Sequence, residues 1–337
     1  MTKGQSQLPH LVTAFFQEHL QRVRGASPNT VRAYALATRL YLGFLADMRG
    51  KPVSKLRLAD FDADGVAAFL SQLETQRGNV AKSRNCRLTA LRCLFRFLAQ
   101  QDPEHAERYQ RVLSLPSKRT RDRPPTYLEP EQVRVVLDQP DRRTRSGIRD
   151  YALLLFLYNT GARVSEALAV RLDDLEFRRP YRVRLLGKGR RERLCPLWRD
   201  TASALRRLAD TQPPRPGGPL FRNARGERIT RDGAAYVLRK HVRLAAARQP
   251  ALLRQKVTPH VMRHSCAVAL LQAGVDLVVI RDYLGHASVA TTSRYVSTNL
   301  NQRRAALESF WKRAGLVGRP AAPWQPTPDL LRFLASL

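Results

Sequence analysis

A stretch of ten residues, 117–126, divides this chain into two parts. It contains four basic residues and two prolines, and it lacks any apolar periodicity. Such a composition is typical of a linker. The chain's 337 residues also exceed what one hydrophobic core usually serves. We therefore expect a first domain of residues 1–116, a basic linker, and a second domain of residues 127–312.

The first part has the pattern of a helical domain. Apolar residues recur at three- and four-residue spacing from about residue 9 to residue 101. Ser27 offers a cap before the second helix, and a third helix surrounds residues 66–73. A fourth, residues 83–98, places on one face the apolar side chains of Leu88, Leu91, Leu94, Phe95 and Leu98.

The second part mixes helices with a small sheet. A helix starts at residues 129–131, and residues 150–157 form a buried helix. Two short strands, 181–186 and 193–197, flank a glycine turn at 187–189. Helices follow. We expect a mainly α chain with a small β-hairpin, that is, a helical domain followed by an α+β domain.

The tail, residues 313–337, has a pattern of its own. A Pro- and Gly-rich stretch precedes residues 329–337, which form one short amphipathic helix on a tether. A helix this short needs a groove to bury its apolar face. The groove belongs either to the same chain or to a neighbouring copy.

The charge balance indicates a polyanionic partner. Lys and Arg number 59 against 28 Asp and Glu, a net charge of +31. Such a field attracts nucleic acid, although a solvated basic surface in an arginine-rich proteome has the same composition. Arginines surround the fourth helix and occur in the linker and the glycine turn. On the helix, Arg84, Arg87, Arg92 and Arg96 either face phosphates or form an ordinary wet face. The residues that we predict to contact DNA are Arg84, Arg87, Arg92, Arg119, Arg121 and Arg190.

The cysteines and the N-terminus indicate where the protein works. Four cysteines, Cys86, Cys93, Cys195 and Cys266, form no C-x-x-C pair, and we interpret them as small core residues. No apolar run has the length of a membrane span or of a signal peptide. We expect a cytoplasmic, nucleoid-associated protein with no membrane contact.

Six polar residues of the second part suggest one chemistry. They are Arg163, Lys188, His260, Arg263, His286 and Tyr295. A phenol can attack a phosphodiester and keep the energy of the broken bond as an ester. Arginine forks can hold the non-bridging oxygens, a lysine can protonate the leaving oxygen, and histidines can donate hydrogen bonds or move protons. Each residue alone could be structural, but together they predict DNA cleavage and religation without a metal or cofactor.

These motifs resemble those of the tyrosine recombinases of the phage integrase family. The segment 160–166 resembles the family's first-arginine box, 259–265 its H-x-x-R box, and 284–295 its nucleophile box. The segment 187–193 is similar to the hairpin that carries the family's lysine. Residues 27–34 and 83–92 resemble the helical, SAM-like core-binding domain.

This resemblance implies an arrangement and a set of roles. The two domains would clamp duplex DNA, and Tyr295 would form a 3′-phosphotyrosyl link. Arg163 and Arg263 would hold the phosphate, while Lys188 would protonate the leaving 5′ oxygen. His260 and His286 would complete the pocket, and Glu166 would orient Arg163. A homotetramer on two specific DNA sites, alone or with a second recombinase, would exchange strands through a Holliday junction, with the tail helix inserted into the next protomer.

Several alternatives remain at this point. The biological role could be integration, excision or transposition of a mobile element, which the long tail favours, or Xer-type resolution of chromosome or plasmid dimers. A type IB topoisomerase uses a similar tyrosine pocket. A DNA-binding protein without chemistry would require a replaced catalytic position, and none is replaced.

Overall fold

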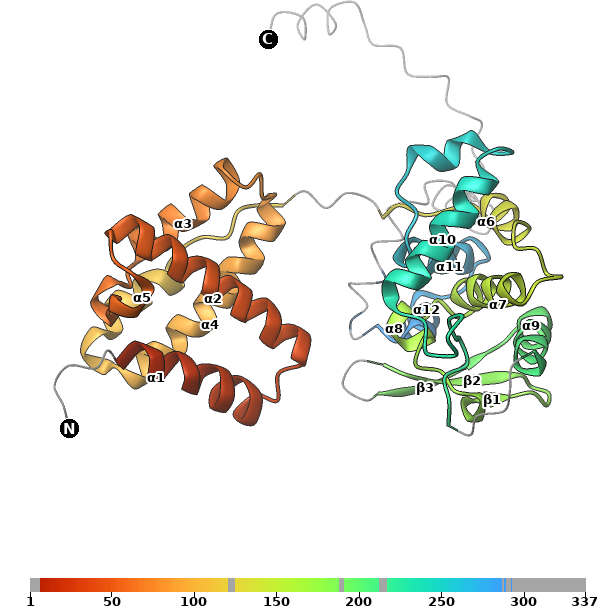
Figure 1. Ribbon diagram of the computed structural model, residues 1–337, viewed down its shortest axis with the longest axis horizontal. Helices are drawn as coiled ribbons and strands as arrows, with labels where there is room; N and C mark the ends of the chain where they lie inside the picture. The colour runs from red at the N-terminus through yellow and green to blue at the C-terminus, as the bar shows by residue number, and fades with distance from the viewer. Residues whose placement is uncertain are drawn as a thin grey trace, which may run out of the picture. The chain divides into compact units, whose positions relative to one another are not determined.

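The chain folds into two compact units. They span residues 1–122 and 123–337 (Figure 1). Each has its own hydrophobic core. The division falls inside the predicted linker. The computed structural model describes residues 7–120, 125–187, 191–211, 217–286, 288 and 292.

Helices make up the first unit, and polar side chains mark where two of them begin. The Ser27 hydroxyl accepts a hydrogen bond from the Thr30 amide at 3.2 Å, so the predicted cap is confirmed. Asp62 does the same for Gly65 at 2.6 Å. The elements are α1 (Gln7–Ala14), its π-helical continuation (Phe15–Val23), α2 (Pro28–Arg49), short 3₁₀ turns at Val53–Lys55, Leu58–Asp60 and Pro103–His105, α3 (Ala63–Thr75), α4 (Ala81–Gln101) and α5 (Ala106–Ser114).

The apolar face of α4 lies at the centre of this unit. Its five predicted core residues are fully buried, and the helix packs against α2, α3 and α5. Helix α5 begins beyond the periodicity that ends at residue 101. The Tyr41 ring lies 5.7 Å from Phe61 and 5.5 Å from Phe69, and an aromatic cluster of this kind adds directional packing to area burial.

The expectation for the cysteines is wrong in one case. Cys93, Cys195 and Cys266 are buried, whereas Cys86 is exposed on α4. Leu88, Leu91 and Leu94, which follow one another at three-residue spacing, occupy the buried face of the helix. Position 86 falls on the opposite side.

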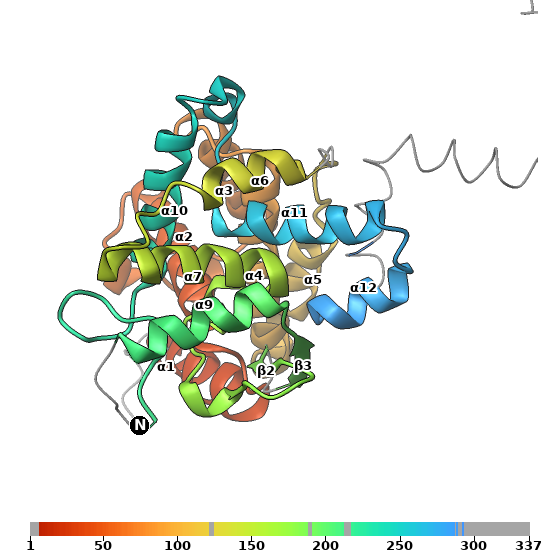
Figure 2. The same ribbon diagram turned by 90° about the vertical axis from the view of Figure 1, so that its right-hand side faces the viewer.

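The second unit is built around α7 (Arg145–Thr160). Its residues 152–157 are all buried, in line with the expected buried helix at 150–157, and Figure 2 shows it between α9 and α11, which both contact it. Around it lie α6 (Pro130–Leu137), α8 (Val164–Ala167), α9 (Arg199–Asp210), α10 (Arg231–Ala245), α11 (Pro259–Gln272), α12 (Leu277–Leu284) and 3₁₀ turns at Leu172–Asp174 and Pro250–Arg254.

A three-stranded antiparallel sheet forms one edge of the second unit. It runs β1 (Leu175–Glu176), β2 (Arg182–Leu186), β3 (Glu192–Pro196), so the predicted hairpin is present with one additional short strand. Val183 pairs with Cys195, and Leu185 pairs with Arg193. Because strands alternate, Arg193 shares the inner face with the buried Cys195.

None of the helices in the described part of the chain is long and apolar enough to cross a membrane.

Candidate active site

The predicted first-arginine segment lies where the C-terminus of α7 meets that of α12. Gly161 ends α7 with a left-handed φ of 55°, and its amide donates to the Leu157 carbonyl at 3.1 Å. A Cβ atom at this position would lie 2.4 Å from the Leu284 side chain and 3.2 Å from the Cys266 sulfur. Glycine is therefore required both by the backbone and by the close approach of α12.

Arg163, two residues further on, is held by a buried carboxylate. Its guanidinium Nη1 donates to Glu166 Oε1 at 2.7 Å, and its amide donates to Glu166 Oε2 at 3.1 Å. The Arg163 side chain stays 36% exposed, against 4% for Glu166. The carboxylate thus fixes one edge of the guanidinium while the side chain stays accessible to a ligand.

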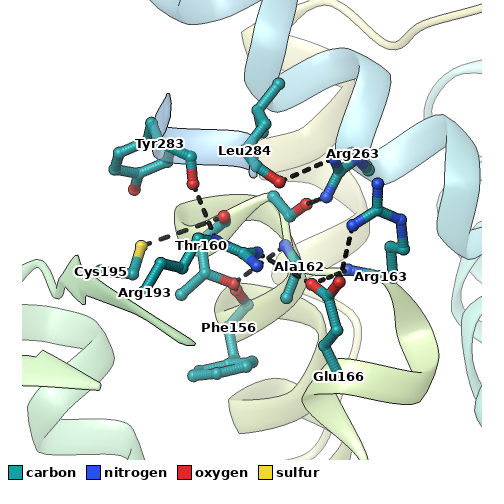
Figure 3. Close-up of polar contacts among 11 residues, drawn as sticks. Phe156, Thr160, Ala162, Arg163, Glu166, Arg193, Cys195, Arg263, Tyr283 and Leu284 are labelled. Carbon is teal, nitrogen blue, oxygen red and sulfur yellow. Dashed lines mark hydrogen bonds and ion pairs between the residues drawn. The ribbon is translucent and has the colours of Figure 1, made fainter. Parts of the chain in front are cut away.

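Glu166 is ionised in this arrangement. Burial by itself would raise the pKa of its carboxyl, but hydrogen bonds and charges from Arg193 and Arg163 outweigh burial and hold the pKa below its ordinary value. One buried carboxylate therefore supports two arginines, which Figure 3 shows on either side of it.

Arg263, on α11, is almost completely buried. Its two terminal nitrogens donate to the Gly161 carbonyl at 2.6 Å and to the Leu284 carbonyl at 2.8 Å (Figure 3). Both acceptors lie at helix C-termini, where carbonyls lack helical partners and the helix dipole favours a cation. The guanidinium joins the ends of α7 and α12 and is held in one position.

His260 and His286 lie in the positive field of both arginines. Burial lowers the pKa of His260, and the charges of Arg263 and Arg163 lower it further. The same causes lower the pKa of His286 to about 4. His286 Nδ1 lies 2.9 Å from the Thr292 hydroxyl. The structure therefore brings Arg163, Arg263, His260 and His286 into one site, in which the imidazoles are neutral at pH 7.

Two of the six predicted residues, Lys188 and Tyr295, lie outside the described residues, as do Arg121, Arg190 and the tail. The chain on both sides of Lys188 is described, however. The Gly187 amide donates to the Arg191 carbonyl at 2.8 Å, which closes the hairpin. A Cβ atom on Gly187 would lie 3.5 Å from Glu166 Oε1. The lysine turn thus begins beside the carboxylate that holds Arg163.

Arg193 is a member of this network that we did not predict as a site residue. Its Nη2 donates to Glu166 Oε2 at 2.8 Å, and its Nε donates to the Tyr283 carbonyl at 3.1 Å. The sequence contains a signal for it, because strand alternation places this arginine on the same face as Cys195. A charge on the inner face of a strand requires a buried partner.

Two α4 arginines of the first unit, Arg84 and Arg92, hold the segment that leads into the linker. Arg84 donates to the Pro116 carbonyl at 3.2 Å, and Arg92 donates to the Leu115 carbonyl. Asn85 exchanges two hydrogen bonds with the Lys118 backbone, at 2.7 and 3.0 Å. We call these contacts of Arg84, Asn85 and Arg92 with residues 115–118 the linker anchor. Arg87 donates to the Ala33 carbonyl instead, and Arg119 is exposed. Their DNA contacts stay a prediction.

Among the described residues, no three His, Cys, Asp or Glu side chains lie together in a way that could hold a metal ion.

Comparison with known families identifies the class of protein. Residues 126–302 match the phage integrase family, and residues 14–102 match the N-terminal SAM-like domain of phage integrases. The chain belongs to the phage integrase family and is a tyrosine recombinase, as its motifs predicted. The predicted fold class is confirmed as well.

Similar proteins include integrases and Xer recombinases. The putative integrase/recombinase y4rC of Sinorhizobium fredii is 41% identical over 337 residues, which is the full length of both chains. Tyrosine recombinase XerC of Pelobacter propionicus is 32% identical over 85% of this chain and 90% of its own. The structure of the XerH recombinase in a post-cleavage complex with palindromic difH DNA shares the fold, with a TM-score of 0.69, 23% identity, and coverage of 93% of this chain and 92% of that one.

Proposed function

We propose that this chain binds duplex DNA at a specific site and exchanges strands through a covalent link to Tyr295. One observation carries the proposal. Arg163 and Arg263 come from segments 100 residues apart and converge on two histidines, each arginine fixed by buried partners. Preorganised donors of this kind stabilise charge on a reacting phosphate without reorganising during the reaction.

The proposed reaction is a transesterification. The Tyr295 oxygen attacks the scissile phosphorus and forms a 3′-phosphotyrosyl ester as the bond to the 5′ oxygen breaks. Arg163 and Arg263 hold the non-bridging oxygens, and Lys188 gives its proton to the leaving 5′ oxygen. The ester conserves the bond energy, so a 5′-hydroxyl from another strand can reverse the step without ATP.

The histidines fit proton transfer from the phenol. An imidazole whose pKa is lowered is neutral at pH 7 and can accept a proton. A bound phosphate adds negative charge, which raises the pKa of a nearby imidazole and strengthens it as a base. We assign His260 and His286 to this part of the pocket, with Glu166 as the group that orients Arg163.

The proposed assembly is a homotetramer on two DNA sites, alone or with a second recombinase, which resolves a Holliday junction. The proposed role is integration, excision or transposition of a mobile element. A relative described as a putative integrase/recombinase that aligns over the full length of both chains supports this role. Resolution of chromosome or plasmid dimers is the alternative, because XerC proteins are also similar.

Covalent capture tests the chemistry. Wild type, Tyr295→Phe and the matched control Tyr236→Phe, whose ring is exposed on α10, are incubated with nicked fragments of the DNA that flanks the gene, then denatured. We expect adducts from wild type and Tyr236→Phe but none from Tyr295→Phe, with DNA binding unchanged in all three. Sequencing the captured DNA would show whether the site lies at the ends of a mobile element.

Other outcomes would contradict the proposal in different ways. Adducts that persist with Tyr295→Phe would show another nucleophile. Tight binding with no adduct from any of the three proteins would indicate a DNA-binding protein without chemistry. Relaxation of a supercoiled plasmid that lacks the captured site would indicate a topoisomerase.

A further inference from the structure

Arg193 lies at an inward-facing position of a β-strand, where an apolar side chain is usual. It faces inward on β3 beside Cys195, and its side chain is only 12% exposed. Placing a guanidinium there costs free energy unless it is fully paired. A leucine or valine would fit the strand pattern without that cost, so the position points to a role for the charge beyond packing.

The contacts of Arg193 connect three parts of the second unit. The side chain extends from the hairpin to Glu166 on α8, at 2.8 Å, and to the Tyr283 carbonyl near the end of α12, at 3.1 Å. A Cβ atom on Gly285 would lie 3.0 Å from the Arg193 Nη1. Glycine at position 285 therefore leaves space for this guanidinium directly before His286.

Arg193 lies close to the turn of the hairpin that carries Lys188. It pairs with Leu185 across the strands, and the closing hydrogen bond of the turn, Gly187 to Arg191, lies two residue pairs further toward the tip. Lys188 follows Gly187 directly in the chain. Fixing Arg193 to Glu166 therefore fixes the base of the lysine turn against the carboxylate that also orients Arg163.

We propose that Arg193 is a positioning residue for the protonation of the leaving group, because it fastens the hairpin that carries Lys188 to the phosphate-binding arginines through Glu166. This inference rests on the proposed function of Tyr295 and Lys188. Arg163 has two hydrogen bonds to Glu166 that do not involve Arg193, and we expect them to persist when Arg193 is replaced. The defect should therefore appear at the lysine more than at the phosphate.

A change of leaving atom separates these two effects. In a DNA substrate with sulfur in place of the bridging 5′ oxygen, the leaving group is a thiolate. Thiols are far more acidic than alcohols, with a pKa of about 8.5 for cysteine, so this leaving group requires little help from a proton donor. We would measure the rate of adduct formation on this substrate and on ordinary DNA for wild type, Arg193→Met, Arg193→Lys and Lys188→Ala.

We expect Arg193→Met to slow adduct formation on ordinary DNA by about 100-fold, the scale of one general acid. On the sulfur substrate it should lie within a few-fold of wild type, as should Lys188→Ala. Arg193→Lys, which keeps a charge for Glu166, should recover part of the rate on ordinary DNA. A thermal melt of each variant, together with normal DNA binding, establishes that the protein is folded.

Three results would overturn the inference. An equal loss on both substrates would mean that Arg193 acts through the phosphate pocket, the end of α12 or the fold alone. A rate equal to that of wild type on ordinary DNA would remove any role. A Lys188→Ala defect that sulfur does not relieve would remove the lysine from the step. Failure of the proposed function itself looks different, because wild type would then form no adduct that depends on Tyr295 with either substrate.

Discussion

The arginines of α4 and those of the candidate active site are held in different ways. Arg84 and Arg92 are partly exposed and donate to carbonyls of the linker anchor. Arg263 is buried and joins two helix ends, and Arg163 is held by a buried carboxylate. Both sets contact other parts of the chain, so contact with the chain alone does not separate a ligand-binding arginine from a structural one.

The two sets differ in how much of each guanidinium stays accessible to a phosphate. At Arg163 the carboxylate fixes one edge and leaves the side chain accessible in a fixed orientation, which favours recognition of a phosphate. At Arg92 the same donors that could reach a DNA phosphate already hold the chain at Leu115. A DNA contact there would have to share that hydrogen bond, and a phosphate contact of Arg263 would likewise have to use the N–H groups that do not donate to Gly161 and Leu284.

We expect the largest effects when either of the two site arginines, Arg163 or Arg263, is replaced by lysine. Arg263→Lys leaves one helix-end carbonyl without its partner and should lower the free energy of unfolding by roughly 3 kcal/mol. Arg163→Lys should change that free energy by less than about 1 kcal/mol, since the Arg163 side chain is 36% exposed and lysine keeps a charge for Glu166, yet slow adduct formation by about 100-fold. Thermal melts and adduct rates measured together test the contrast. Equal loss of stability in both variants would contradict it.

A smaller effect is expected in the pH dependence of stability. The pKa of His286 is lowered to about 4 in the folded chain, against 6.5 for an unperturbed histidine. Between these values the unfolded chain binds the proton and the folded chain does not, so the stability from this group is lost as the pH falls from 6.5 toward 4. The free energy of unfolding, measured with urea at several pH values, should change less between pH 6.5 and 4 in His286→Asn than in wild type. His10→Gln, at an exposed position on α1, serves as the control. A dependence of stability on pH that is unchanged in His286→Asn would refute the assignment.

The smallest effect is expected in the linker anchor. Arg92→Gln should lower the free energy of unfolding of the first unit by about 1 kcal/mol, because it removes the donor to Leu115. Arg96→Gln, at an exposed position on the same helix, should change it by less than about 0.5 kcal/mol. The salt dependence of DNA binding sharpens the comparison, since each lost phosphate contact reduces the slope by about 1. If Arg92→Gln reduced the salt dependence of DNA binding without lowering stability, Arg92 would be a DNA-contacting residue.

Part of the site could be predicted from residue order, and part could not. In the structure the segment 160–166, the pair His260 and Arg263, and His286 lie together, and each follows a local signal that also shapes the backbone. Gly161 ends α7, Pro259 begins α11, and Gly285 ends α12. The sequence patterns do not predict Arg193 as a site residue, since its charged partner is a carboxylate 27 positions earlier in the chain.

By itself, the sequence determined the helical periodicity, the caps, the hairpin, the division near residue 120 and the family, because these depend on neighbours along the chain and on motifs of fixed spacing. Only the tertiary structure decided which partners each charged side chain has and how deeply it is buried. Whether a guanidinium is buried against carbonyls, shares one carboxylate with another arginine or holds a linker depends on partners far away in the chain. Pairing and burial, which set the free energy of a charge, follow from packing and not from local sequence.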